Sequence, residues 1–389
     1  MLLMRGKLAS LKVVTVSSAE ALSALTVEWN ALAKATDASS VFLLHEWHMS
    51  AWKWLSSSCT LAVLQVVDGG HTVGILPLVR ERYSTRFGAA TRLRTFEIPD
   101  TQQVSLLCAA DDADSVAGAI VAELARISRE RTLLQMQKLS DTPANAALGR
   151  RLGEESRLVA GSGDSCPCVP LNGTWGDYYS RRSRRLKKGN NLIANRLRKA
   201  FKSVDVARTV VDAGPAGRQA FSELLELSGN SWKRELPTAL HRTEPRAWVD
   251  ELRQRLGSTG ALVLWSLRLD GALAAAELQL DFAGIVSALR AEVRQELESH
   301  GPGTFLGWVV LESLMDGGRT IYNMGPGLSD YKARWAESNQ PLARIDWYSP
   351  TLSGLLLWLV EGLVRPTASR LRARLRAAAT KPKNASNVS

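Results

Sequence analysis

The stretch that most constrains the fold is the Gly-Pro-Gly turn at 301–303, with the helix and strand that follow it. These residues cannot continue a strand, and Thr304 is a good N-cap for the apolar run behind it. The spacing predicts a helix from near Thr304 to Gly-Gly 317–318, then a strand over 319–324. The amides and dipole of such a helix start suit a phosphate, most simply a pyrophosphate. The pattern also fits a plain turn into a core helix.

Length and composition indicate a globular chain of two domains. The 389 residues exceed one ordinary core, since domains average roughly 150 residues. Hydrophobic residues make up 45% and charged residues 22%, which is the balance of a soluble globular protein. No apolar run reaches the roughly 18 residues of a membrane-spanning helix, and the N-terminus is no convincing signal peptide. We therefore expect a cytoplasmic protein.

The cysteines and histidines do not indicate a metal site. The four cysteines form no disulfide framework, and Cys-Pro-Cys at 166–168 has one residue between its thiols, whereas zinc and redox motifs have two. His45 and His48 lie three apart on a predicted helix, but no third ligand is in sight. We expect no metal.

Positive charge is concentrated in two segments. Ten basic residues and no acidic residue occupy 180–202, and seven more basic residues follow from 365 to the end. The net charge is +11, so the rest of the chain carries about −6 once these seventeen are set aside. Two basic segments on a mildly acidic body predict anionic partners such as phosphates, RNA or a membrane surface. For the segment 180–202, a solvated basic helix remains the alternative.

The order of the predicted elements is the second strong constraint. From residue 204, periodicity and the Asp-Gly hairpin signal predict these elements: strand 204–211, helices 215–228 and 246–256, strands 261–269, 272–281 and 285–293. With the glycine turn, helix and strand that follow, this is the layout of an N-acetyltransferase (GNAT) fold. The first half predicts a mixed α/β unit with these elements: helix 18–35 capped by Ser18, strands 61–67, 72–79, 93–98 and 104–108, helix 114–129, and strand 133–137.

A family resemblance rests on segments from both halves. They are VFLLHEWHMSAW at 41–52, DGGHTVGILPLVRERY at 68–83, SRRSRRLKKGNNLIANRLRKAF at 180–201, SWK at 231–233, LDGALAAAELQL at 269–280, GPGTFLGWVVLESLMDGG at 301–318 and GPGLSDYKARWAE at 325–337. The chain resembles the CelD-like branch (cellulose biosynthesis protein CelD) of the GNAT superfamily, which is related to the FemABX aminoacyltransferases. The resemblance covers roughly residues 10–350.

The resemblance implies an α/β (α+β) fold of tandem GNAT-like lobes, each a mixed, mostly antiparallel sheet flanked by helices. We expect an N-terminal lobe at 1–165 and a C-terminal acyltransferase lobe at 166–350, which includes the basic helix 178–202. An amphipathic helix and a basic, partly disordered tail are expected at 351–389. An acyl thioester, acetyl-CoA or another acyl-CoA, would bind in the C-terminal lobe.

Acyl transfer needs a general base, an acid for the leaving thiolate and groups that hold the donor. The candidate catalytic residues are Glu277, Asp330 and Tyr331. The candidate donor-binding residues are Gly301, Gly303, Thr304, Lys332 and Arg334. The candidate acceptor-binding residues are Trp232, Lys233 and Arg290. For Glu277, an ion pair with Arg290 on the neighbouring strand is the structural alternative, and Trp335 fits packing better than binding.

One departure from the family pattern concerns charge. Arg290 stands where the pattern has a lysine, and Glu292, Glu296 and Glu298 add negative charge near the proposed anion site. Acidic neighbours weaken phosphate binding. Either these side chains point away from the site, or the role of the cofactor has drifted.

The C-terminal segment adds a helical apolar stripe, composed of Leu352, Leu355, Leu356, Leu359, Val360 and Leu363. An arginine-rich run follows, so 352–376 resembles an interfacial membrane helix. The alternative is a stripe that packs on the protein body.

The predicted function is acyl-CoA-dependent N- or O-acyl transfer to a sugar, amino acid or envelope-polysaccharide precursor. Two alternatives remain: a FemABX-like aminoacyltransferase that uses aminoacyl-tRNA, and a non-catalytic scaffold of a polysaccharide synthesis complex, anchored peripherally at the inner face of the membrane.

Overall fold

The computed structural model describes residues 11–85, 88–128, 131–155, 158–315 and 317–360. The N-terminal lobe contains β1 Lys12–Val16, α1 Ala19–Ser23, α2 Thr26–Asp37, α3 His45–Leu55, β2 Thr60–Leu61, β3 Val63–Asp68, β4 His71–Leu76, β5 Leu78–Thr85, β6 Gly88–Thr95, β7 Leu107–Cys108, α4 Ala113–Ile127, β8 Thr132–Leu139, α5 Pro143–Glu155 and β9 Leu158–Pro170. The C-terminal lobe contains α6 Trp175–Ser180, α7 Arg184–Ala200, β10 Val204–Val210, α8 Pro215–Gly229, α9 Thr243–Leu256, β11 Leu262–Leu269, β12 Ala272–Phe282, β13 Ile285–Val293, α10 Pro302–Met315, β14 Ile321–Asn323, α11 Asp330–Trp335, β15 Ser338–Tyr348 and α12 Leu352–Leu357.

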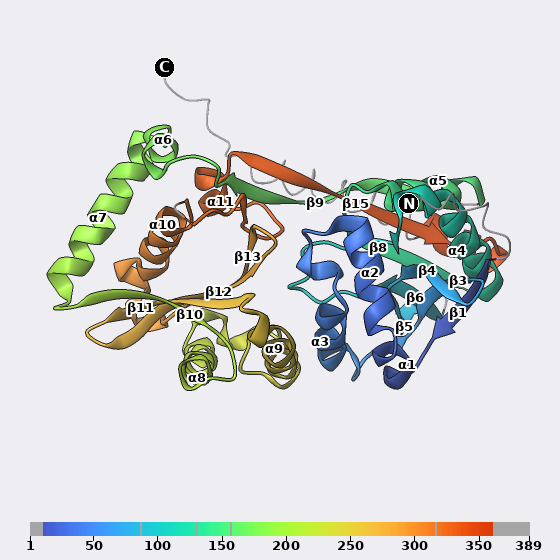
Figure 1. Ribbon diagram of the computed structural model, residues 1–389, viewed down its shortest axis with the longest axis horizontal. Coiled ribbons are helices and arrows are strands. Elements are labelled where there is room, and N and C mark those ends of the chain that lie inside the picture. The colour runs from blue at the N-terminus through green and yellow to red at the C-terminus, as the bar shows by residue number, and fades with distance from the viewer. Residues whose placement is uncertain (1–10, 86–87, 129–130, 156–157, 316, 361–389) are drawn as a thin grey trace, which may run out of the picture.

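The two lobes share one long sheet because they exchange their last strands. Its order is β10-β11-β12-β13-β14-β9-β15-β8-β6-β5-β2. Strand β9, which ends the N-terminal lobe, pairs with β14, and β15, which ends the C-terminal lobe, pairs with β8. The two exchanged strands also pair with each other, from Ser338 opposite Cys168 to Trp347 opposite Leu158. Figure 1 shows them side by side, running from one lobe to the other.

A second contact between the lobes is an aromatic helix interface. Helix α3 of the N-terminal lobe packs on α9 of the C-terminal lobe. The Trp47 and Trp248 rings meet edge to face with centroids 5.8 Å apart, and both side chains are fully buried. One hydrophobic core therefore continues from the N-terminal lobe under α8 and α9.

The C-terminal sheet separates two layers of helices. Leu264 and Leu278 face the core under α8 and α9, whereas Val263 and Trp265 face the core under α10. Adjacent residues of a strand point to opposite faces, which explains the alternation. The hairpin of β11 and β12 turns at Asp270-Gly271, where both residues have positive φ, as the sequence signal predicts. Figure 1 shows α7 outermost, with α10 between it and the strands.

Strand β13 pairs with β14 over only three residues. Ile285 to Ser287 lie parallel to Ile321 to Asn323, and β14 then ends while β13 continues to Val293. On its other edge, against β12, β13 has a register shift between Ala288 and Arg290. We call residues 288–293 the free edge of β13, because β14 does not extend along them. The free edge ends at Val293, which contacts the glycine turn where the acyl donor is expected.

The structure corrects several element boundaries. The predicted strand 72–79 is broken at Pro77 into β4 and β5, which belong to different sheets, because proline cannot donate to a ladder. The predicted helix 18–35 is divided into α1 and α2, although Ser18 caps it as expected. Helix α10 starts at Pro302, not Thr304, since proline suits the first helical position.

Other elements were not predicted from the sequence. Helix α5 and strand β15 lie in segments for which it predicted no element. The proposed boundary between 165 and 166 falls inside β9, which pairs with strands of both lobes. The basic segment 178–202 contains the end of α6, a turn, and α7, whose N-terminus Ser183 caps.

The C-terminal stripe is described only in part. Leu357 is buried against Leu133 and Tyr348, whereas Leu352 and Leu356 are exposed. Residues 361–389, which hold the arginine-rich tail, lie outside the described residues. Across the described ranges, no helix is both long and apolar enough to cross a bilayer.

A buried ion pair between the lobes gives the first test. Arg290 Nε lies 2.5 Å from Asp100 Oδ1, and their side chains are 12% and 3% exposed. Asp100→Ala leaves the guanidinium buried without its carboxylate, so we expect the free energy of unfolding to fall by about 3–5 kcal/mol. Adding Arg290→Met removes that charge and should recover most of the loss. Urea unfolding measures both, and a double variant no more stable than Asp100→Ala would contradict the assignment.

Candidate active site

The residues that the sequence singled out divide between the two faces of the C-terminal sheet. Glu277 lies opposite Trp265 in the strand pairing and so faces α10. Arg290 lies opposite Leu278 and so faces the N-terminal lobe. The alternative of a Glu277–Arg290 ion pair is therefore wrong. Arg290 pairs with Asp100 instead, because the two candidate partners project from opposite faces.

The glycine turn leads directly into α10. Gly301 has φ of +77°, a conformation that favours glycine, and Pro302 starts the helix. The Phe305 amide donates to the Gly301 carbonyl, so the amides of Gly303 and Thr304 lie ahead of the intrahelical ladder. A Cβ atom on Gly303 would lie 2.8 Å from Val293 Cγ2, which leaves no room for a side chain there. The turn has the backbone geometry of an anion site.

A hollow of about 560 Å³ opens between α7, the start of α10 and α11. Thr304, Asp330, Tyr331 and Arg334, four of the predicted site residues, line it. Residues of the basic helix also line it, and they are Arg185, Leu186, Gly189, Asn190 and Ile193, with Ser183 before the helix. The structure thus brings the basic helix, the helix start and α11 to one place.

An aromatic stack fixes α6, and with it the start of α7, over this hollow. Tyr179 stacks on Trp175 at 4.8 Å between centroids and on Trp308 of α10 at 6.0 Å. The Tyr178 hydroxyl donates to the Trp335 carbonyl at 2.5 Å, and Arg181 and Arg182 both pair with Glu337. Trp335 is fully buried in this cluster and packs, as the sequence reading favoured, while it also lines the hollow.

Glu277 lies at the centre of a buried hydrogen-bond chain. Its Oε1 accepts from the Tyr322 hydroxyl at 2.5 Å and from Gln279 Nε2 at 2.7 Å. Gln279 Oε1 accepts in turn from Trp265 Nε1 at 3.1 Å. Burial raises the pKa of Glu277, and the two hydrogen bonds only partly oppose that rise. The sequence reading missed Tyr322 and Gln279, although the polar Gln279 within the apolar strand 272–282 is a visible signal.

Tyr331 is the acid candidate beside Glu277. Its hydroxyl rests against Gly307 in α10, where a larger residue would overlap it. Burial raises the pKa of Tyr331, and the charge of Glu277 raises it further. Tyr331 therefore keeps its proton at neutral pH. Asp330 and Arg334, from the same short helix, are exposed at the rim.

Lys332 occupies a different position from the one expected. Its ammonium donates to the carbonyls of Gly325 and Pro326 at 2.9 Å each, and so caps the loop between β14 and α11. Burial lowers its pKa. Lys332 does not line the hollow. Arg185 does, although the sequence did not single it out as a donor-binding residue.

The acceptor candidates lie on the face toward the N-terminal lobe. Lys233 donates to the Ala291 carbonyl and lies 4.0 Å from the buried carboxylate of Glu292. Trp232 beside it is 54% exposed. Glu292 thus points away from α10, and Glu296 and Glu298 are exposed on the 3-10 helix Gln295–His300. Glu292, Glu296 and Glu298 therefore do not line the hollow. Of the two explanations considered for their charge, the structure favours side chains that point away from the site.

The histidines of α3 belong to the core of the N-terminal lobe. A ring nitrogen of His45 lies 2.9 Å from the Leu22 carbonyl, and one of His48 lies 3.0 Å from the Leu44 carbonyl. Burial lowers the pKa of His48 to about 4. The described residues include no group of three or more side chains placed to bind a metal.

The contact between Gly307 and Tyr331 is testable without a substrate. Gly307→Ala places a methyl group on the Tyr331 hydroxyl, so we expect a loss of about 1–3 kcal/mol in the free energy of unfolding. In a Tyr331→Phe background the loss should shrink, because the nearest remaining atom is a ring carbon at 3.3 Å. Gly118→Ala in α4 meets nothing within 4 Å and serves as the control, neutral or stabilising. Equal losses in both backgrounds would contradict this packing.

A family model described as an acetyltransferase (GNAT) domain matches residues 187–333. The match runs from the basic helix through the glycine turn to α11 and so includes part of each side of the hollow, whereas Arg185 and Arg334 lie just outside it. None of the curated proteins compared matches the chain.

Solved structures match over most of the chain. A crystal structure of FemX has a TM-score of 0.53 and 11% identity, over 86% of this chain and 98% of that one. The C-terminal domain of a putative lysylphosphatidylglycerol synthetase from Agrobacterium fabrum has a TM-score of 0.53 and 11% identity, over 87% of this chain and 97% of that one. At such identities they show the fold alone. The chain is thus an acyltransferase with a GNAT-type acetyltransferase domain on a tandem GNAT fold.

Proposed function

We propose that this protein transfers an acyl group from acyl-CoA to an amine or hydroxyl of a sugar, amino acid or envelope-polysaccharide precursor. The observation that carries the proposal is the hollow between α7, α10 and α11, where a helix start, two arginines and a protonated tyrosine converge. A CoA thioester needs these features together: anion-binding groups for its phosphates, and an acid near its sulfur. The finer placement in a CelD-like branch, and a role in polysaccharide synthesis, belong to this proposal.

The donor phosphates would bind at the start of α10. Amides of the first helical turn and the helix dipole favour an anion there, and Gly301 and Gly303 let it approach the backbone. Arg185 and Arg334 line the same hollow and supply positive charge. Lys332 does not bind the donor phosphates in this proposal, because its ammonium donates to the carbonyls of Gly325 and Pro326.

The chemical step assigns complementary roles to two side chains. Glu277 accepts the proton of the attacking amine or hydroxyl as the new bond to the acyl carbon forms. The carbon–sulfur bond breaks, and the Tyr331 hydroxyl gives its proton to the leaving thiolate. Asp330, exposed at the rim, would hold an acceptor amine. Trp232 and Lys233, on the opposite face of the sheet, would contact more distant parts of a glycan acceptor.

The outer face of α7 favours a second candidate, an aminoacyltransferase that uses aminoacyl-tRNA. Arg184, Lys188, Arg198 and Lys199 are exposed along this helix. Within the described part of the chain, the salt bridges of this region involve Arg181 and Arg182, which precede α7. A line of cations without paired carboxylates suits an RNA backbone. The fold shared with FemX is compatible with this candidate as well.

The exposed Leu352 and Leu356 favour a third possibility, a scaffold at the inner face of the membrane. In that case the protein would be cytoplasmic with a peripheral membrane contact through 352–376, and neither donor would bind.

Two arginines of α7 distinguish these candidates. Arg185 lines the hollow, whereas Arg198 lies thirteen residues further along the helix, roughly 20 Å away, and is exposed. If acyl-CoA is the donor, Arg185→Glu should weaken acetyl-CoA binding at least tenfold, because it replaces attraction for phosphate with repulsion. Arg198→Glu should change it less than twofold. Isothermal titration with acetyl-CoA measures both.

The same pair of variants gives a different result for the second candidate. Binding of bulk tRNA would weaken with either substitution and would fall steeply with salt. Stabilisation by tRNA but not by acetyl-CoA in a thermal shift assay would sink the CoA proposal, and a response to neither ligand would favour the scaffold.

The role of Glu277 predicts a pH dependence. A base must be deprotonated, and burial raises the pKa of Glu277 above its ordinary value of 4.5. The rate of thiol release from acetyl-CoA, with amino sugars or amino acids as acceptors, should therefore rise as pH increases through that raised pKa and then level off. Glu277→Gln should lower the rate about 10²- to 10⁴-fold and abolish its rise with pH through that pKa. If the rate of the variant still rises with pH over the same range, another group is the base.

A further inference from the structure

The N-terminal lobe reaches the free edge of β13 through one loop. Residues 96–103, which we call the brace loop, follow β6 and carry Asp100 and Gln102 to β13. Asp100 pairs with Arg290, and Gln102 Nε2 donates to the Ala288 carbonyl at 2.6 Å. Both contacts fall where β13 shifts register against β12. Two residues of one lobe thus touch the strand that leads to the expected donor site of the other lobe.

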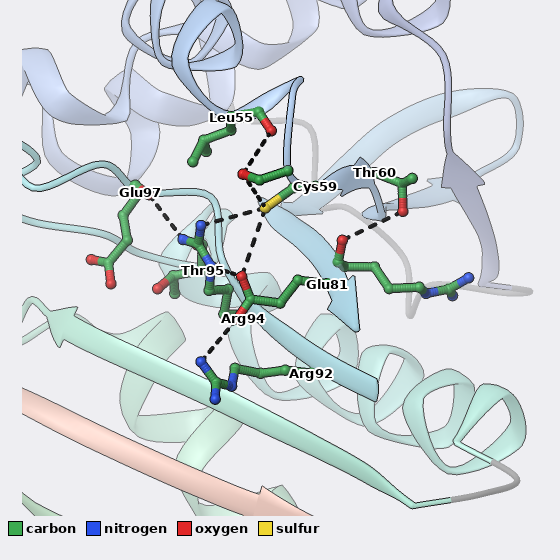
Figure 2. A network of polar contacts seen from close by, with 10 residues as sticks. Leu55, Cys59, Thr60, Glu81, Arg92, Arg94, Thr95 and Glu97 are labelled. Carbon is green, nitrogen blue, oxygen red and sulfur yellow. Dashed lines mark hydrogen bonds and ion pairs between the residues drawn. The ribbon is translucent and has the colours of Figure 1, made fainter. Parts of the chain in front are cut away.

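The first half of the brace loop is held by charged side chains of its own lobe. Arg94 donates to the Glu97 carbonyl at 3.0 Å and is itself oriented by Glu81 at 3.2 Å, as Figure 2 shows. From the other side, the Lys138 ammonium lies 3.3 Å from the Pro99 carbonyl and 3.8 Å from the Glu97 carboxylate. These two cations restrict the freedom of residues 97–99.

Hydrogen bonding decides how the Gln102 amide is oriented. A carbonyl oxygen only accepts, so the atom that faces Ala288 must be the NH₂ group. The Oε1 atom therefore points the other way. Gln102 as a whole is only 2% exposed, and its Oε1 atom is buried without a hydrogen-bond partner among the described residues. A buried acceptor without a donor costs free energy that a bound N–H group would recover.

The surroundings of Gln102 place it beside the free edge. A Cβ atom built on Gly325 would lie 3.4 Å from both Gln102 Nε2 and the Ala288 oxygen. Gly325 has φ of +79° and opens the loop that follows β14. Gln102 therefore lies between β13 and the loop after β14, where a continued β14 would otherwise pair with β13.

We propose that Gln102 binds the amide-bearing arm of the acyl donor: its Nε2 holds the Ala288 carbonyl, and its Oε1 accepts a hydrogen bond from an N–H of the arm. The N-terminal lobe then supplies part of the donor site in the C-terminal lobe. This inference rests on the proposed function, because it requires the donor to be a CoA thioester.

The test separates the arm of CoA from its nucleotide. Gln102→Met keeps the size of the side chain but removes both amide groups. We expect it to weaken binding of CoA about tenfold, as the loss of a buried hydrogen bond would. Binding of adenosine 3′,5′-bisphosphate, which lacks the arm, should stay within twofold of the wild type. Isothermal titration measures both ligands.

Gln103→Met is the matched control. Gln103 is the neighbour of Gln102 in the brace loop, but its Nε2 donates to Asp37 within the N-terminal lobe, at 3.0 Å. This variant should bind CoA like the wild type, and thermal unfolding checks that both variants are folded.

Each outcome is decisive. If the wild type binds CoA and Gln102→Met binds it equally well, or loses both ligands alike, the inference is overturned while the proposed function stands. If the wild type binds no CoA, the proposed function fails and the inference fails with it.

Discussion

The pairing of β9 with β15 is the interaction on which the rest of the structure depends. Each strand ends its own lobe and completes the sheet of the other, so neither sheet is finished by its own lobe alone. Backbone hydrogen bonds along these strands hold the lobes in a defined relative position. That position sets where the brace loop meets β13 and where α3 meets α9. A shift between the lobes would have to break the ladder as well as the buried Asp100–Arg290 pair.

The C-terminal sheet also sorts the charges of the site. Glu277 and Glu292 are both buried carboxylates, but they project from opposite faces of the sheet. Glu277 on β12 pairs with Ala291 on β13, and Glu292 on β13 pairs with Ala276 on β12, so the two glutamates stand one position apart in the ladder, where side chains alternate between the faces. The face under α10 carries Glu277 with its two neutral hydrogen-bond donors, near a hollow lined by arginines. The other face carries Glu292 with Lys233. An anion that enters the hollow is thus shielded by the sheet from the second carboxylate.

Local signals predicted the C-terminal lobe well and the joint between the lobes poorly. Strand β13 has the predicted bounds Ile285–Val293, because the Ala283-Gly284 turn, in which both residues have positive φ, precedes it and the glycine turn follows it. Strand β15 could not be predicted, since SNQPLARIDWY contains a proline, lacks alternation, and is a strand because β8 and β9 flank it. Glu277, Tyr331 and Thr304, whose roles are proposed above, were singled out from their sequence contexts. Asp100 and Gln102 were not, because their partners Arg290 and Ala288 lie about 190 residues away and no local pattern reports such a contact.

Buried polar atoms without a hydrogen bond occur in both lobes, and each has an energetic cost. Gln102 Oε1, Trp335 Nε1 and both carboxylate oxygens of Glu292 are buried without a hydrogen bond among the described residues. Each such atom destabilises the folded chain by about 1–3 kcal/mol, so a sequence selected for stability alone would pair or remove them. The exchanged strands and the aromatic stack supply stability that offsets this cost. Because Gln102 and Trp335 are held by rigid neighbours, their unpaired atoms stay aimed in one direction. A ligand that pairs with them then gains binding free energy without first having to order the site.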